Sequence, residues 1–172
     1  PYTYGYIDTL PSKVTGITQT VTSSSFTLKW DKNESADGYT VQYYADGKWN
    51  EKTLVGNKKT TVTIGSLKGY KTYKVRIKAY KGELESTFDD IYITTAPTKV
   101  SGLKVKSAVD SKAVVIWNAD TNADGYNVEY YIGGRWLEKT ITDNKTAMAV
   151  LGGLTPYITY KVRVRAYKDN LY

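Results

Sequence analysis

Apolar and polar residues alternate strictly along residues 72–81, Thr-Tyr-Lys-Val-Arg-Ile-Lys-Ala-Tyr-Lys. One face of this stretch carries Tyr73, Val75, Ile77 and Ala79, and the other carries the basic residues between them. A period of two with β-branched and aromatic residues predicts a β-strand that is buried on one side. Residues 159–168 repeat the pattern almost letter for letter. The chain is therefore predicted to be a tandem repeat.

Other short alternating stretches occur twice and in the same order. They are residues 14–17 and 100–103, 26–30 and 114–117, 39–44 and 126–131, and 60–64 and 147–151, with further strands around Trp49 and Trp136. Asp46-Gly47 and Gly133-Gly134 are typical of tight hairpin turns. Residues 88–95 supply a seventh strand in the first repeat only. Seven short strands with turns between them predict two antiparallel Greek-key β-sandwiches, an all-β fold.

Proline residues mark where the repeats begin, at Pro11 and Pro97, so we predict domains at 11–96 and 97–172. Aligning these prolines places residues 6–9 on residues 92–95, the last strand of the first repeat. Residues 1–10 are therefore interpreted as the orphan last strand, strand G, of a preceding repeat. The second repeat is expected to lack its own strand G.

A second repeat without strand G would leave the edge of its sheet open. One hypothesis is that residues 2–9 of one molecule fill this edge in another, which joins molecules head to tail. The residues expected to form the swapped strand are Tyr2, Tyr4, Tyr6 and Ile7. The alternative is a truncated repeat that frays at its end.

Composition excludes several classes of function. The sequence contains no cysteine and no histidine, so disulfides, thiolate sites and the commonest general base are excluded. We therefore expect no enzyme activity, no cofactor and no metal. The net charge of +7 is scattered over the strands rather than gathered in a basic block, so we do not predict nucleic-acid binding. The sequence contains no apolar run long enough to predict a segment that spans a membrane.

Several motif positions agree twice and in order, and through them the chain resembles fibronectin type III repeats. They are Trp30 at the end of a strand, Tyr39-x-Val41, and Leu67 followed by Tyr73-x-Val75, with Leu154-Thr155-Pro156 before Tyr160 in the second copy. The resemblance implies that Tyr73 and Tyr160 form the tyrosine corner, in which the hydroxyl bonds to the upstream backbone. The motif Ala-Asp-Gly-Tyr-x-Val is similar to repeats of bacterial extracellular and cell-surface proteins.

Two sets of aromatic residues are candidates for a structural core and for a ligand face. The expected core residues are Trp30, Tyr39, Tyr73, Trp117, Tyr126 and Tyr160. The candidate ligand face, on the outside of the sheet, comprises Tyr44, Trp49, Arg76 and Tyr80 with their counterparts Tyr131, Trp136, Arg163 and Tyr167. Aromatic rings beside cations can stack on sugars, but they can equally stack on each other as cross-strand pairs. We favour the structural interpretation.

Three further patterns are weaker. Residues 120–125 match the first half of a calcium loop, but Tyr131 stands where the bidentate Glu belongs, so a plain turn is favoured. Glu83, Glu85, Asp89 and Asp90 are acidic, yet nothing nearby predicts a pocket that would separate their pKa values. Asn33-Glu34-Ser35 and Asn144-Lys145-Thr146 are glycosylation sequons, which matter only in a eukaryotic secretory setting.

The function expected from these features is that of a non-catalytic spacer or interaction module of an extracellular or cell-surface protein. The joint at residues 95–98 contains no glycine, so the two domains are expected to form a semi-rigid rod. Its partners would be the neighbouring domains of the same polypeptide. The alternative is an adhesion module that binds a polysaccharide or a protein through the aromatic face.

Overall fold

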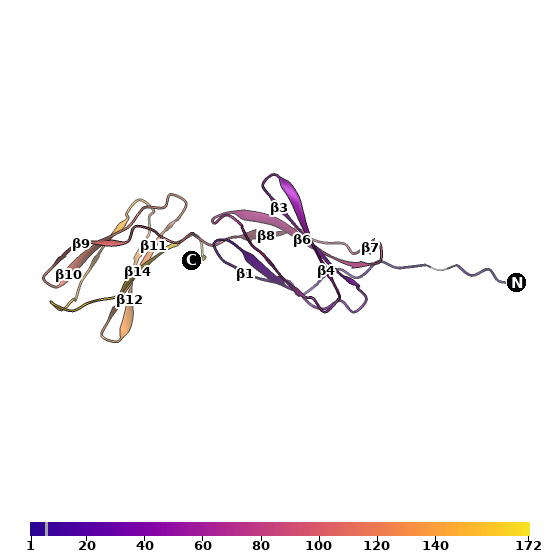
Figure 1. Ribbon diagram of the computed structural model, residues 1–172, viewed down its shortest axis with the longest axis horizontal. Coiled ribbons are helices and arrows are strands. Elements are labelled where there is room, and N and C mark those ends of the chain that lie inside the picture. The colour runs from indigo at the N-terminus through magenta and orange to yellow at the C-terminus, as the bar shows by residue number, and fades with distance from the viewer. Residues whose placement is uncertain (6) are drawn as a thin grey trace. The chain divides into compact units, whose positions relative to one another are not determined.

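A computed structural model describes residues 1–5 and 7–172, and every regular element in it is a β-strand (Figure 1). Tyr6, one of the residues expected to form the swapped strand, lies outside the described residues. No helix in the described part of the chain is long and apolar enough to cross a membrane. The all-β prediction is confirmed.

The first repeat contains eight strands in two antiparallel sheets. The strands are β1 (Thr18–Val21), β2 (Phe26–Lys29), β3 (Gly38–Ala45), β4 (Lys48–Val55), β5 (Thr61–Ile64), β6 (Thr72–Lys81), β7 (Leu84–Glu85) and β8 (Ile91–Thr94). One sheet has the order β1-β2-β5, and the other has the order β4-β3-β6, with β7 and β8 both pairing with β6.

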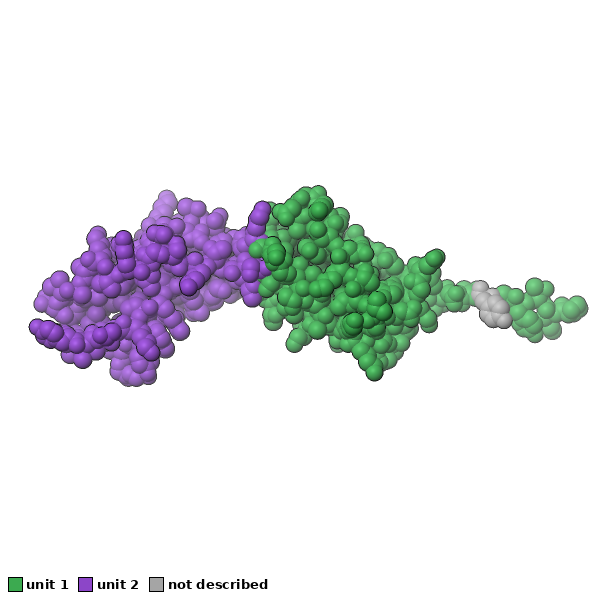
Figure 2. Space-filling model, viewed as in Figure 1, with its two compact units in different colours: residues 1–21, 25–67, 71–94 green, residues 22–24, 68–70, 95–172 purple. Residues whose placement is uncertain are grey.

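The second repeat contains six strands in the same arrangement. They are β9 (Lys104–Val109), β10 (Lys112–Ile116), β11 (Gly125–Ile132), β12 (Arg135–Ile141), β13 (Met148–Leu151) and β14 (Val162–Tyr167). Its sheets have the orders β13-β10-β9 and β12-β11-β14. Figure 2 colours the two compact units, which are residues 1–21, 25–67 and 71–94 and residues 22–24, 68–70 and 95–172.

The alternation that predicted the fold also decides which side chains are buried. On β6, the inward residues Tyr73, Val75, Ile77 and Ala79 are all at most 4% exposed. They join the core of the first repeat, which includes Phe26, Leu28, Trp30, Tyr39 and Val41. At the predicted hairpin between β3 and β4, Asp46 and Gly47 both have positive φ, as a primed two-residue turn requires.

Four predicted strands differ from the structure. The first strand of each repeat begins later than residues 14–17 and 100–103, because Gly16 and Gly102 adopt positive φ of 65° and 71°, which breaks the extended backbone. Strand β8 covers only residues 91–94 of the predicted 88–95. The described residues among 1–10 form no strand, because an isolated strand has no partner with which to pair its backbone groups.

Candidate functional site

The aromatic residues of the candidate face meet on the outside of the sheet that contains β3, β4 and β6. Tyr44 on β3 pairs directly with Trp49 on β4, and their rings lie edge to face with centroids 5.6 Å apart. The guanidinium carbon of Arg76, on β6, lies 4.1 Å from the centroid of the Trp49 ring. These three residues, which we call the first stack, form a cation–π arrangement.

The head group of Arg76 is already engaged within the protein. Its Nε donates to Oε1 of Gln42 at 2.6 Å, and the amide of Gln42 donates to Glu51 at 2.7 Å. The guanidinium carbon of Arg76 also lies 4.6 Å from the centroid of the Phe88 ring. The Nζ of Lys78 lies 5.4 Å from the same centroid. The guanidinium of Arg76 therefore contacts a neutral amide of its own sheet and the ring of Phe88, in the segment that precedes β8.

The second repeat builds an equivalent stack from Tyr131, Trp136 and Arg163. The two rings are 5.4 Å apart and edge to face, and the guanidinium carbon lies 4.1 Å from the Trp136 centroid. Here Glu129 replaces Gln42, and Arg163 donates to both of its oxygens, at 2.5 and 3.2 Å. The hydrogen bond from Arg163 lowers the pKa of Glu129 below its ordinary value and raises the pKa of Arg163 above its own.

Tyr80 and Tyr167, which the sequence grouped with the stacks, lie elsewhere on the sheets. Tyr80 is the pairing partner of Gly38 at the other end of β3, and Tyr167 is the partner of Gly125. A Cβ placed on Gly38 would lie 2.5 Å from the Tyr80 hydroxyl, so the tyrosine covers the glycine closely. The candidate ligand face is thus divided into a stack and a separate tyrosine in each repeat.

The stacks leave part of each ring accessible to solvent. Trp49 and Trp136 are each 38% exposed, and Tyr44 and Tyr131 are 44% and 40% exposed. Chemically, such a surface can hold a ring or a planar group by stacking, but the cations beside it already have protein partners. It offers no nucleophile paired with a base.

The expected core residues form an edge-to-face pair inside each repeat. Trp30 and Tyr39 have centroids 5.2 Å apart, as do Trp117 and Tyr126, and all four are at most 5% exposed. Tyr160 differs, because it is only half-buried. Its hydroxyl accepts a hydrogen bond from the backbone N–H of Thr155 at 2.7 Å, in the manner implied for a tyrosine corner.

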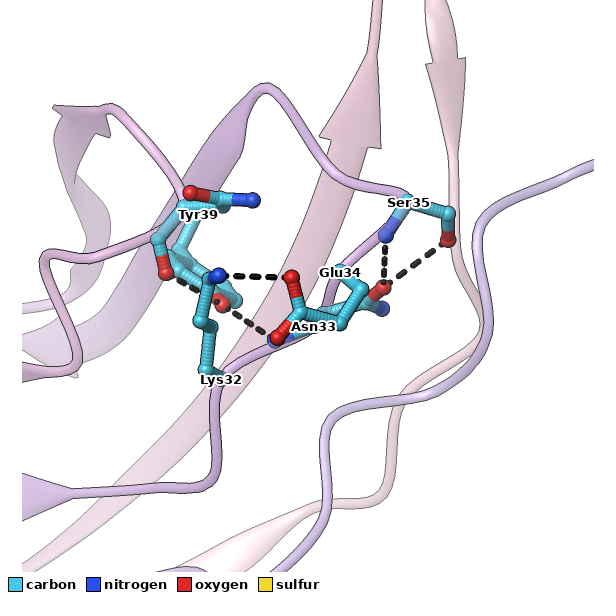
Figure 3. A network of polar contacts seen from close by, with 6 residues as sticks. Lys32, Asn33, Glu34, Ser35 and Tyr39 are labelled. Atoms are coloured by element: carbon cyan, nitrogen blue, oxygen red, sulfur yellow. Dashed lines mark hydrogen bonds and ion pairs between the residues drawn. The ribbon is translucent and has the colours of Figure 1, made fainter.

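The loop between β2 and β3 is held by hydrogen bonds of Asn33 (Figure 3). The Asn33 amide donates to the backbone oxygen of Ser12 at 2.8 Å, and its oxygen accepts from the N–H and hydroxyl of Ser35. The backbone N–H of Asn33 donates to the hydroxyl of Tyr39 at 2.7 Å. Asn33 is 8% exposed, so the side-chain amide of this sequon is buried and is used in hydrogen bonds within the fold.

Asp120, which lies within the partial calcium motif, occupies the position in the second repeat that is equivalent to Asn33. Its N–H donates to the hydroxyl of Tyr126 at 2.6 Å, and its carboxylate accepts from the N–H of Asn122. No group of three or more potential metal ligands exists in the described part of the chain. The amide of Asn144, in the other sequon, donates to the backbone oxygen of Thr121 at 3.0 Å.

The acidic residues near β7 and β8 are paired with lysines rather than with one another. Asp90 lies 2.8 Å from Lys74, and Glu85 lies 2.5 Å from Lys78. Asp89 forms an ion pair with Lys13. The hydrogen bond to Asp90 raises the pKa of Lys74. These carboxylates therefore do not form an acid–base pair.

Sequence reasoning missed the partners of the stacks, namely the polar residues Gln42, Glu51 and Glu129 and the aromatic residue Phe88. Each is an ordinary residue for an exposed strand or loop, so nothing in its identity marks it. The signal that could have found three of them is register, because Gln42 lies opposite both Glu51 and Arg76, and Glu129 lies opposite Arg163.

Comparison with known proteins supports the same architecture. The sequence model of the fibronectin type III domain matches residues 11–94 and 95–171. The chain is 30% identical to human tenascin-N over 160 residues, which are 90% of this chain and 12% of that protein. It is 32% identical to chicken tenascin over 153 residues, which are 87% of this chain and 8% of that protein. The chain thus spans about a tenth of the length of these curated relatives.

A solved structure has the same fold over nearly the whole chain. It is a segment of two fibronectin type III domains from chicken tenascin, with a TM-score of 0.52 and 22% sequence identity. The match covers 92% of this chain and 93% of that one. The relatives named come from human and chicken, so the expected kinship with bacterial repeats gains no support from them.

Proposed function

This chain belongs to the fibronectin type III family, and from that membership we propose that it acts as a non-catalytic spacer and interaction module. In this role the two repeats hold neighbouring domains of the same polypeptide apart. The setting proposed is an extracellular or cell-surface protein. The bacterial setting expected from the motif Ala-Asp-Gly-Tyr-x-Val stays a prediction.

The observation that carries this proposal is the internal pairing of the exposed cations. Arg76 and Arg163 each lie 4.1 Å over a tryptophan of their own sheet, and each donates to a polar side chain of the neighbouring strand. A side chain that recognises a ligand has to exchange its contacts within the protein for contacts with that ligand. Each of these two stacks instead links three strands of one sheet, as expected for a surface that resists unfolding.

The segment between the repeats supports a semi-rigid spacer. Thr95 and Ala96 are 1% and 4% exposed, and Pro97 is buried. The hydroxyl of Thr95 donates to the backbone oxygen of Lys68 at 2.7 Å. The backbone N–H of Ala96 donates to the backbone oxygen of Thr22 at 3.0 Å. A buried and hydrogen-bonded segment with a fixed proline φ has little conformational freedom.

Single-molecule energy transfer tests the spacer directly. Because the chain has no cysteine, dyes can be attached at Lys48→Cys and Lys145→Cys, one in each repeat, and both sites are exposed. We expect one narrow distance distribution, which Pro97→Gly broadens. Pro11→Gly, at the matching position before the first repeat, is the control and leaves the distribution unchanged. A broad distribution in the parent chain would contradict the spacer proposal.

A binding module for a polysaccharide or a protein is the second candidate, favoured by the partly exposed rings of Trp49 and Trp136. A glycan-array signal that disappears in Trp49→Ala or Trp136→Ala would support it. Retained binding in both variants would exclude this face. Head-to-tail association with another copy of the chain, through residues 2–9, completes the proposed set of partners.

A further inference from the structure

The outer face of the β13-β10-β9 sheet, in the second repeat, is apolar. Along β10, Val115 is buried in the core, and its neighbours Val114 and Ile116 point outward. Their pairing partners on β13 are Val150 and Met148, respectively. Met148 and Val150 are each 43% exposed, and the other two are half-buried. These four outward residues, which we call the apolar face, form two cross-strand pairs on the surface of the domain.

The first repeat has polar residues at all four matching positions. They are Thr27 and Lys29 on β2 and Thr61 and Thr63 on β5, which pair in the same register. The hydroxyls of Thr27 and Thr63 lie 2.8 Å apart and share a hydrogen bond. The opposite sheet does not differ in this way, because both repeats keep the aromatic–cation stack. The second repeat therefore offers an apolar surface at the place where the first repeat presents hydroxyls to water.

Lysines border the apolar face. Lys104 and Lys106 lie on β9, Lys112 begins β10, and Lys139 of β12 donates to a backbone oxygen of β13 at 3.3 Å. All four lysines are exposed, and within the described residues none of them forms an ion pair with a carboxylate. Strands β9, β10 and β13 contain no Asp or Glu, and Asp110 lies in the turn between β9 and β10. The border of the apolar face therefore attracts negative charge.

The width of this surface matches that of a single α-helix. Neighbouring strands lie about 4.8 Å apart, so the three strands of the sheet span about 10 Å. A helix with its side chains is about 10–12 Å across. Lys104 of β9 lies opposite Ile116, and Lys139 reaches β13 from the other side. A helix that lies along the apolar pairs would therefore have a lysine beside each of its borders.

We propose that the apolar face of the second repeat binds an amphipathic helix of a partner protein, whose apolar stripe is bordered on both sides by Asp or Glu. The stripe packs on the two cross-strand pairs, as helices pack on the faces of sheets. The carboxylates pair with Lys104 and Lys139, which have no acidic partner of their own among the described residues. This inference goes beyond the proposed function, because it assigns a binding site on the sheet that does not carry the aromatic–cation stack.

Charge and shape favour this partner over two other occupants. A second copy of the chain would bring its own lysines toward these lysines, and each copy carries a net charge of +7. A lipid surface is favoured by aromatic side chains at the depth of the head groups, and strands β9, β10 and β13 contain none. The aliphatic side chains also lie flat on a sheet, where half of them are half-buried, so they suit packing against a protein surface. An acidic amphipathic helix satisfies both the charge and the shape.

Two synthetic helical peptides of about five turns test the site. Both carry a leucine stripe, which is bordered by glutamates in one peptide and by lysines in the other. Each is titrated into the isotope-labelled full chain, and amide chemical shifts are followed by NMR. We expect saturable shifts at β10 and β13 with the glutamate peptide, and binding of the lysine peptide that is at least about tenfold weaker.

A double variant, Met148→Thr with Val150→Thr, tests the apolar pairs. Both residues are exposed, and the first repeat carries threonine at the matching positions, so the fold should stay intact. We expect the glutamate peptide to bind this variant at least about tenfold more weakly. Trp136→Ala, on the other sheet of the same repeat, is the matched control and should bind the peptide normally.

Absence of binding, equal binding of the two peptides, or unchanged binding by the threonine variant would overturn the inference. Co-sedimentation of the chain with vesicles of phosphatidylserine and phosphatidylcholine, if the threonine variant abolished it, would assign the face to a lipid surface instead. Shifts at β10 and β13 that grow with chain concentration in the absence of peptide would assign it to a second copy. Each of these outcomes would leave the spacer proposal, which the energy-transfer measurement tests separately, unaffected.

Discussion

Arg76 lies over Trp49 with its guanidinium carbon 4.1 Å from the ring centroid, although the two residues belong to strands that are not adjacent. Strand β3 runs between β4 and β6, so the Arg76 side chain crosses it to reach the indole. On the way, its Nε donates to Gln42 of β3. One side chain thus ties three strands together on the outside of the sheet.

Trp30 should contribute more to stability than Trp49, although both belong to the first repeat. Trp30 is 5% exposed and packs edge to face on Tyr39, whereas Trp49 is 38% exposed. We expect Trp30→Ala to cost about 3–5 kcal/mol of unfolding free energy, measured by urea denaturation, because it leaves a core cavity. Trp49→Ala is the matched control and should cost clearly less.

Trp30→Phe should be milder than Trp30→Ala. The indole N–H of Trp30 has no hydrogen-bond partner within the described residues, so its removal gives up no polar contact. Equal losses for Trp30→Phe and Trp30→Ala would show that the packing argument is wrong.

Asn33 should be a stability residue rather than a modification site. Replacing it by Ala removes the bonds to Ser12 and Ser35 that hold the loop between β2 and β3. We expect a loss of about 1–3 kcal/mol in urea denaturation, as for other buried hydrogen-bonded side chains. Asn144→Ala, in the other sequon, is the control and should cost less because Asn144 is only half-buried. Equal losses would contradict this role.

The second repeat should lose stability in acid through three carboxyls. The pKa of Asp124 is lowered mainly by a hydrogen bond from the backbone N–H of Asp169. The pKa of Asp143 is lowered mainly by a hydrogen bond from the backbone N–H of Thr146, and the pKa of Glu129 is lowered mainly by the hydrogen bond from Arg163. A carboxyl with a lowered folded-state pKa binds its proton more weakly when folded. Its stabilisation is therefore complete above the unfolded-state pKa of about 4 and is lost as pH falls through the folded-state value.

Residue-resolved NMR in urea at pH 7, 5, 4 and 3 measures this acid sensitivity. We expect the unfolding midpoint of the second repeat to fall mainly below pH 4. In Asp143→Asn the decline should be smaller, because that side chain no longer titrates. A midpoint that does not change between pH 5 and 3 would disprove the assignment.

The sequence predicted the fold because period-two alternation depends only on neighbouring residues, and β6 follows it at every buried position. The stacks were predicted in part, since tryptophan and arginine are recognisable by type. Their partners were not, because the roles of Gln42 and Glu129 follow from strand register. Tyr80 was misplaced among the stack residues because its position is set by Gly38 opposite it, which leaves room for the ring.

A double-mutant cycle on Trp49 and Arg76 tests the central claim, that each aromatic–cation stack holds the strands of its sheet together. Native-state amide exchange on β6 reports the free energy of unfolding of the first repeat for the parent chain, Trp49→Ala, Arg76→Ala and the double variant. We predict a coupling energy of about 0.5–1 kcal/mol between the two side chains. Additive single losses, with a coupling below about 0.3 kcal/mol, would contradict the structural role.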